Sequence, residues 1–184
     1  MKADASNATY WDKSFKENVK EESDRAMVII AASMIDQALE AALRGRLVQL
    51  HTTEDPLFES SYAPLADFSA KIDLAYRIGL LPPNYAKGLH LIRKIRNEFA
   101  HSASRCTFEE PSVRNRMQEL NKSLGVADAA RANKLDFPQG LRGDFEATAS
   151  WIIWNLRFRA EEIEAIQAPN EWKPKKPDEN EDGT

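Results

Sequence analysis

The sequence predicts an all-α fold, a bundle of five or six helices, and three observations support this. Apolar residues recur at helical spacing in several long segments, and no segment shows the alternation that is typical of a strand. Stretches rich in Pro, Gly, Ser and Asp separate these segments. With 184 residues, of which 42% are hydrophobic and 29% charged, the chain can bury one core.

The chain divides into three parts. Residues 1–20 form a polar lead-in with room for one short helix, and residues 21–168 form the helical bundle. Residues 169–184 are charged and contain prolines, so we expect a disordered tail.

The first long helix is the most apolar. From Met27 to Leu47, hydrophobic side chains cover nearly the whole helix circumference, which indicates a helix at the centre of the bundle or in a subunit interface. Ser23 or Asp24 provides its N-cap.

Turn residues define the other helices. Residues 51–67 read as a loop, and Asp67 caps a helix over 68–81 that Pro82 and Pro83 end. Pro83 then opens a helix that runs to about residue 103. We expect further helices over residues 109–124, 127–132 and from Gly143-Asp144 to residue 167.

Composition narrows the function classes. The net charge of −4 and the pI of about 5.5 argue against direct binding of duplex DNA, which calls for a basic face. A single cysteine, Cys106, fits a reducing cytoplasm. We find no membrane-length apolar run, no secretory signal and no metal-ligand cluster, so we expect neither a membrane segment, nor a metal, nor a cofactor.

The segment KIRNEFAH, which ends at His101, concentrates polar residues in an otherwise apolar helix. On a helix, Asn97 and His101 lie within about 40° of each other, and Arg93 and His90 extend the same stripe. Arg96 lies about 140° away from His101. Only the long Arg side chain, a kink or a second subunit would therefore bring Arg96 and His101 to one ligand.

Two interpretations of this segment remain open. In the catalytic one, His101 is a general acid or base in phosphodiester cleavage, Arg96 stabilises charge on phosphorus, and Asn97 orients His101 or holds a phosphate oxygen. In the structural one, Asn97 and His101 form hydrogen bonds to buried groups, with Asp36 and Asp73 as candidate partners. The negative C-terminal end of the helix dipole near His101 disfavours an incoming phosphate.

Other polar residues are candidates for binding. Asp36 lies in the apolar helix, where an unpaired carboxylate is costly, so we expect it to meet an Arg or a His. Arg25 and Asp24 are placed to line a pocket rim, or to form an N-cap and a salt bridge. A ligand-sensing pocket near Asp36, Arg93 and His101 is a further hypothesis.

Three blocks of sequence resemble the mannitol operon repressor family of bacterial proteins. They are EESDRAMVIIAASMIDQALEAALRGRL, DPLFESSYAPLADFSAKIDLAYRIGLL and LHLIRKIRNEFAHS, and the resemblance that includes them extends over about residues 21–124. The resemblance implies an all-helical fold, a cytoplasmic location and a role in transcriptional repression. Because the composition argues against direct DNA reading, a protein partner is the expected route.

The RNEFAH block also resembles the Arg-x4-His signature of HEPN helical domains, many of which are metal-independent ribonucleases that act as dimers. This resemblance implies that Arg96 and His101 form a catalytic pair with Asn97 beside them, and that two motifs meet across a homodimer interface. The leading hypothesis is a dimeric regulatory protein that acts through a protein partner. The alternative is a HEPN-type endoribonuclease or its inactive descendant, for which RNA is the partner.

Overall fold

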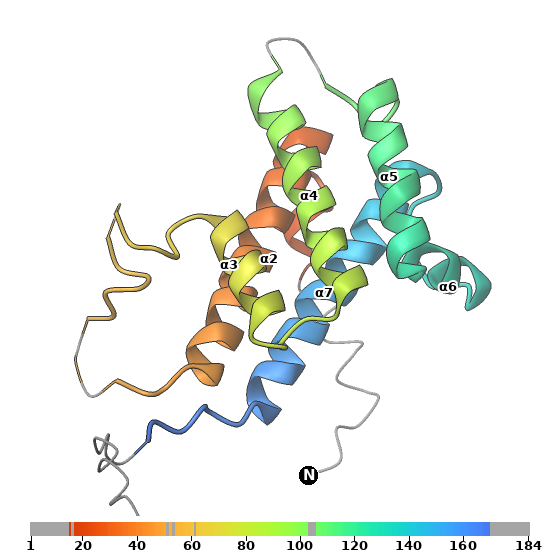
Figure 1. Ribbon diagram of the computed structural model, residues 1–184. Helices are drawn as coiled ribbons and strands as arrows, with labels where there is room; N and C mark the ends of the chain where they lie inside the picture. Colours follow the sequence, from red (N-terminus) through yellow and green to blue (C-terminus); the bar gives the residue numbers. More distant parts are fainter. Residues whose placement is uncertain are drawn as a thin grey trace, which may run out of the picture.

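The computed structural model describes residue 15 and residues 17–50, 52, 54–60, 62–102 and 106–169. This part of the chain contains no strand, so the predicted all-α bundle is confirmed. Residues 17–19 of the expected lead-in are helical, but the rest of the lead-in up to residue 14 and the tail from residue 170 lie outside the described residues. The labelled helices are α2 (Asp24–Arg46), α3 (Phe68–Arg77), α4 (Pro83–His101), α5 (Pro111–Leu124), α6 (Val126–Ala132) and α7 (Leu141–Glu162) (Figure 1).

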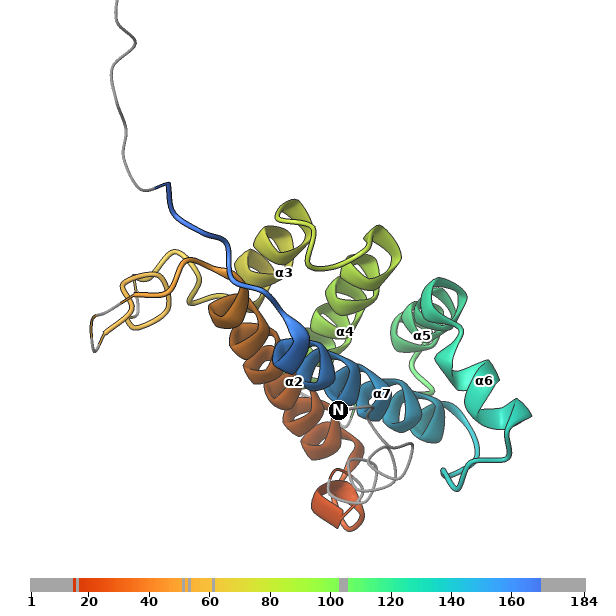
Figure 2. The ribbon, with the colours of Figure 1, turned by 90° about the horizontal axis from the view of Figure 1, so that it is seen from below.

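Helix α2 is central, as its composition predicted. It contacts α3, α4 and α7, and nine of its residues are buried. Ser23 is the N-cap, and its side chain accepts a hydrogen bond from the Ala26 amide at 3.2 Å. Helix α7 lies along α2 in a parallel orientation (Figure 2). Arg142 at the start of α7 pairs with Asp24 at the start of α2. Near the other end of both helices, Gly45 of α2 lies close to the Ala160 carbonyl of α7.

Helix α2 is also long and apolar enough to cross a membrane by length and composition alone, with a mean hydropathy of 1.6 in its most apolar window. This corrects the expectation that no apolar run reaches that length. Half of that window is buried inside the bundle, and the core helix of a soluble protein passes the same test. The finding is therefore weak evidence for a membrane span.

Helices α3 and α5 flank α4 (Figure 1). Helix α3 ends at Arg77 rather than at residue 81, because Gly79 adopts a φ of 73° that turns the chain before Pro82. Pro83 occupies the first turn of α4, as predicted. On the other side, the Gly88 backbone lies so close to Leu124 that an added Cβ would come within 2.8 Å of the leucine Cδ1.

Helix α7 differs from the prediction at both ends. It begins at Leu141, so that Gly143 falls inside its first turn, where the backbone packs against the Pro138 carbonyl. It ends at Glu162 rather than at residue 167. The chain that follows runs beside the end of α2 instead, where the Ile166 amide donates a hydrogen bond to the Arg46 carbonyl at 2.8 Å.

A row of aromatic rings joins the two sides of the core at the end of α4. The rings of Phe99 and Phe108 have centroids 5.2 Å apart, and those of Phe108 and Phe145 have centroids 5.5 Å apart. All three residues are buried. This packing fixes the last turn of α4, which carries the candidate site.

Candidate functional site

Helix α4 is amphipathic, and its buried residues recur at helical spacing on one face. Leu89, Ile92, Ile95 and Phe99 are completely buried. The opposite side of the helix carries the polar residues of the KIRNEFAH segment. Burial of one face thus fixes the direction in which the candidate residues point.

Asn97 and His101 lie together, as their spacing predicted. They line a pocket of about 390 Å³ on the outer side of α4 with Lys94, Glu98, Ser102 and Arg116. Arg96 is not among the lining residues. Within one chain, the structure therefore brings Asn97 to His101 and leaves Arg96 on another side of the helix.

The structure does not favour the structural interpretation of this segment. His101 is exposed, and Arg96 and Asn97 are half-buried. None of the three forms a hydrogen bond or an ion pair with another described residue. Sequence reasoning named Asp36 and Asp73 as partners of Asn97 and His101, but both carboxylates contact other side chains.

Asp36 pairs with Lys71 of α3, not with an Arg or a His as expected. Lys71 Nζ lies 2.9 Å from Asp36 Oδ1 and 2.8 Å from Glu40 Oε2, and the lysine is 4% exposed. Burial alone would lower the pKa of Lys71, but the hydrogen bonds to Glu40 and Asp36 outweigh it and the pKa is raised. The two carboxylates thus hold α3 against α2 through Lys71, which is a structural role.

Asp73 pairs with His90 across the contact between α3 and α4, where His90 Nε2 lies 3.1 Å from Asp73 Oδ1. Arg93 is half-buried one turn further along α4, and its Nε is buried with no hydrogen-bond partner among the described residues. The suggested ligand pocket of Asp36, Arg93 and His101 stays a hypothesis: Lys71 Nζ binds Asp36, and the pocket that His101 lines contains neither Asp36 nor Arg93.

Arg25 reaches the end of α4 from the start of α2. Its Nη2 donates a hydrogen bond to the Ser102 carbonyl at 2.8 Å. Ser102 is the C-cap residue of α4, directly after His101. The guanidinium offsets the negative end of the α4 dipole, which had been the physical objection to an anion at this place.

Glu98 and Arg116 are two of the lining residues that sequence reasoning missed. Glu98 Oε2 accepts a hydrogen bond from Arg116 Nη1 of α5 at 2.7 Å, and Glu98 Oε1 accepts one from Ser112. The Arg116 bond, then the Ser112 bond, holds the pKa of Glu98 below its ordinary value. Glu98 shares the helix surface with Asn97 and His101, so spacing could have found it. Arg116 comes from another helix, α5, and no local sequence pattern predicts that it lines this pocket.

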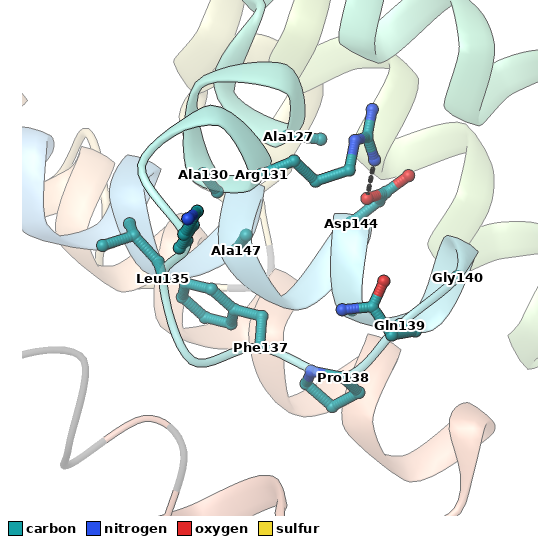
Figure 3. Close-up of a pocket in the computed structure, with 12 residues that line it drawn as sticks. Ala127, Ala130, Arg131, Leu135, Phe137, Pro138, Gln139, Gly140, Asp144 and Ala147 are labelled. Carbon is teal, nitrogen blue, oxygen red and sulfur yellow. Dashed lines mark hydrogen bonds and ion pairs between the residues drawn. The ribbon is translucent and has the colours of Figure 1, made fainter.

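A second pocket, of about 330 Å³, lies between α6, α7 and the loop that joins them (Figure 3). In Figure 3 the Arg131 side chain extends toward Asp144, with which it forms an ion pair. Asp128 binds the same guanidinium. Because both aspartates already hold Arg131, this pocket offers no free cation at that position.

The described residues contain no group of three or more His, Cys, Asp or Glu side chains placed to hold a metal ion.

By its fold and its candidate site, the chain is an all-helical protein with a polar site at the end of one helix, α4. No family model and no curated protein matches the sequence. Among solved structures, the fold is similar to that of a chain in the X-ray structure of the MtlR-HPr complex from Escherichia coli. The TM-score is 0.59 at 16% sequence identity, and the match covers 80% of this chain and 99% of that chain. The likeness is one of fold.

Proposed function

We propose that this chain is a cytoplasmic bacterial regulatory protein that acts in transcriptional repression by binding a protein partner. The observation that carries the proposal is the fold, since the match takes in 99% of a chain from a complex of MtlR, a mannitol operon regulator, with HPr. The three sequence blocks within residues 21–124 support it, because they resemble the mannitol operon repressor family. HPr is the first partner to test.

Direct reading of DNA is not part of this proposal. A recognition helix has to enter the major groove with its side chains toward the bases. Helix α4 follows the turn after α3, but α2, α3 and α5 all contact it and eight of its residues are buried. The net charge of −4 also opposes binding to a polyanion.

Titration calorimetry with purified HPr tests the proposal, and gel-shift assays with operon promoter DNA run beside it. We expect a complex with HPr and no shift of DNA by the pure protein. A tight and sequence-specific DNA complex of the pure protein would overturn the partner-mediated mechanism.

The second candidate function is a HEPN-type metal-independent ribonuclease that acts as a homodimer. The observation in its favour is that Arg96, Asn97 and His101 reach the surface without a partner among the described residues. Two copies of the α4 end would then combine Arg96 of one chain with His101 of the other. Cleavage of generic RNA in EDTA, lost in His101→Ala at unchanged thermal stability, is the result that would favour this function.

A further inference from the structure

Helix α4 concentrates positive charge in an otherwise acidic chain. It carries four Lys or Arg residues and a single acidic residue, Glu98, which gives a formal charge of +3 (4 − 1) when His is counted as neutral, as it is in the net charge of the chain. Arg116 already pairs with Glu98 at 2.7 Å. The chain as a whole has a net charge of −4, so the charge of α4 is opposite in sign to that of its surroundings.

The cations of α4 are not used within the described part of the molecule. None of its Lys or Arg side chains forms an ion pair with a described carboxylate, and these residues are Lys87, Arg93, Lys94 and Arg96. By contrast, Arg44, Arg114 and Arg142 are each paired with a carboxylate elsewhere in the described structure. The buried Nε of Arg93 also lacks an acceptor.

Two of these cations, Lys87 and Lys94, form a row with His101 along the helix. Lys87, Lys94 and His101 are exposed and follow one another at seven-residue spacing. Seven residues are close to two turns of an α-helix, so the three side chains lie on one side at intervals of about 10.5 Å. Asn97 lies beside this row, in the same pocket as Lys94 and His101.

From this row we infer that α4 is the docking surface for an acidic helix of a protein partner. An α-helix with carboxylates at seven-residue spacing repeats its charges at the same interval of about 10.5 Å. The inference rests on the proposed function, because it names the surface and the chemistry of the partner. Charge complementarity of this kind sets orientation and association rate.

The same features fit nucleic acid less well. Duplex DNA presents a negative charge about every 1.7 Å of its axis, far denser than the row on α4. Single strands are held by stacking on aromatic side chains. The aromatic residues of α4, Tyr85 and Phe99, are buried and offer no such platform.

The test uses the full chain and two stapled 18-residue helical peptides that each carry five Glu residues. In the first peptide the Glu residues occupy one face, and in the second they are distributed around the helix. NMR titration of the isotope-labelled protein gives both affinity and location. We expect the one-face peptide to bind at least tenfold tighter, to perturb Lys87, Lys94 and His101, and to weaken as salt rises.

The variant is Lys87→Gln with Lys94→Gln, and the matched control is Lys20→Gln with Lys134→Gln, which removes the same charge from exposed positions outside α4. We expect the affinity for the one-face peptide to fall about tenfold in the α4 variant and to change less than twofold in the control. Both variants should unfold at the same denaturant concentration as wild type. Equal binding of the two peptides would overturn the inference. The inference would also be overturned if a single-stranded RNA bound tighter than the one-face peptide and if this RNA binding were lost in the α4 variant.

Titration with HPr separates this inference from the proposed function. In one outcome, HPr binds the α4 variant as tightly as wild type and the protein shows no preference for the one-face peptide. This outcome leaves the proposed function standing and overturns the docking surface. A preference for the one-face peptide that is lost in the α4 variant supports the docking surface, even when HPr itself does not bind.

Discussion

Arg25 Nη2 donates a hydrogen bond to the Ser102 carbonyl over 2.8 Å, between residues 77 positions apart in the chain. The bond joins the first turn of α2 to the C-cap of α4. It therefore fixes the end of α4 beside His101 and places a positive charge at the negative end of the helix dipole.

Removal of this bond should loosen the end of α4. We expect Arg25→Met to lower the free energy of unfolding by about 1 kcal/mol, because a half-buried, charge-assisted hydrogen bond is lost. Urea denaturation measures the change, and Arg77→Met, at an exposed position on α3, is the control. Faster amide exchange confined to the last turn of α4 is also expected. An exchange pattern identical to that of wild type would contradict the role assigned to Arg25.

Lys71 stabilises the contact between α2 and α3. We expect Lys71→Met to lower the free energy of unfolding by about 2 kcal/mol, since two carboxylates lose their shared cation. The value is below that for a fully buried pair because Asp36 and Glu40 are each about 30% exposed. Thermal and urea unfolding at pH 7 measure it. A variant as stable as wild type would show that Lys71 is dispensable.

The same cluster predicts a dependence of stability on pH. Burial would raise the pKa of Glu40, but hydrogen bonds from Lys71 and Arg44 hold it below its ordinary value of 4.5. Its contribution is therefore fully present above that value and is lost as the pH falls through the lower pKa of the folded state. We expect wild type to lose stability more steeply than Lys71→Met between about pH 5 and pH 3. Parallel curves in urea titrations would contradict this account.

Two glycines in long helices should respond in opposite directions. In Gly143→Ala, the new Cβ would lie 1.7 Å from the Pro138 carbonyl oxygen, so we expect a loss of at least about 3 kcal/mol. In Gly45→Ala, the nearest atom is 3.8 Å away, so the better helix propensity should add up to about 1 kcal/mol. Unfolding of both variants by urea measures the pair. A Gly143→Ala variant with the same free energy of unfolding as wild type would contradict the close approach of Gly143 to the Pro138 carbonyl.

His101 should matter little for stability. It is exposed and has no partner among the described residues, so we expect His101→Ala to change the free energy of unfolding by less than about 0.5 kcal/mol. His90→Ala, which removes the contact with Asp73, is the comparison. A loss of about 2 kcal/mol in His101→Ala would restore the structural interpretation of this residue.

The sequence predicted the elements that local chemistry determines. Ser23 caps α2, Pro83 opens α4, and the i, i+4 spacing brings Asn97 to His101.

The errors came from contacts between distant segments. Lys71 is a lysine in an amphipathic helix, and nothing near it in the sequence shows that it is buried against Asp36 and Glu40. Arg116 enters the pocket from α5 for the same reason. The early end of α3 depends on Gly79, whose positive φ ends the helix before the two prolines are reached.

The most direct test of the central claim is calorimetric titration of the purified chain with HPr, with RNA cleavage in EDTA measured on the same preparation. The account predicts a saturable complex with a Kd on the order of 1–100 μM and no RNA cleavage. No complex at millimolar HPr, together with RNA cleavage that His101→Ala abolishes, would contradict it and favour the ribonuclease.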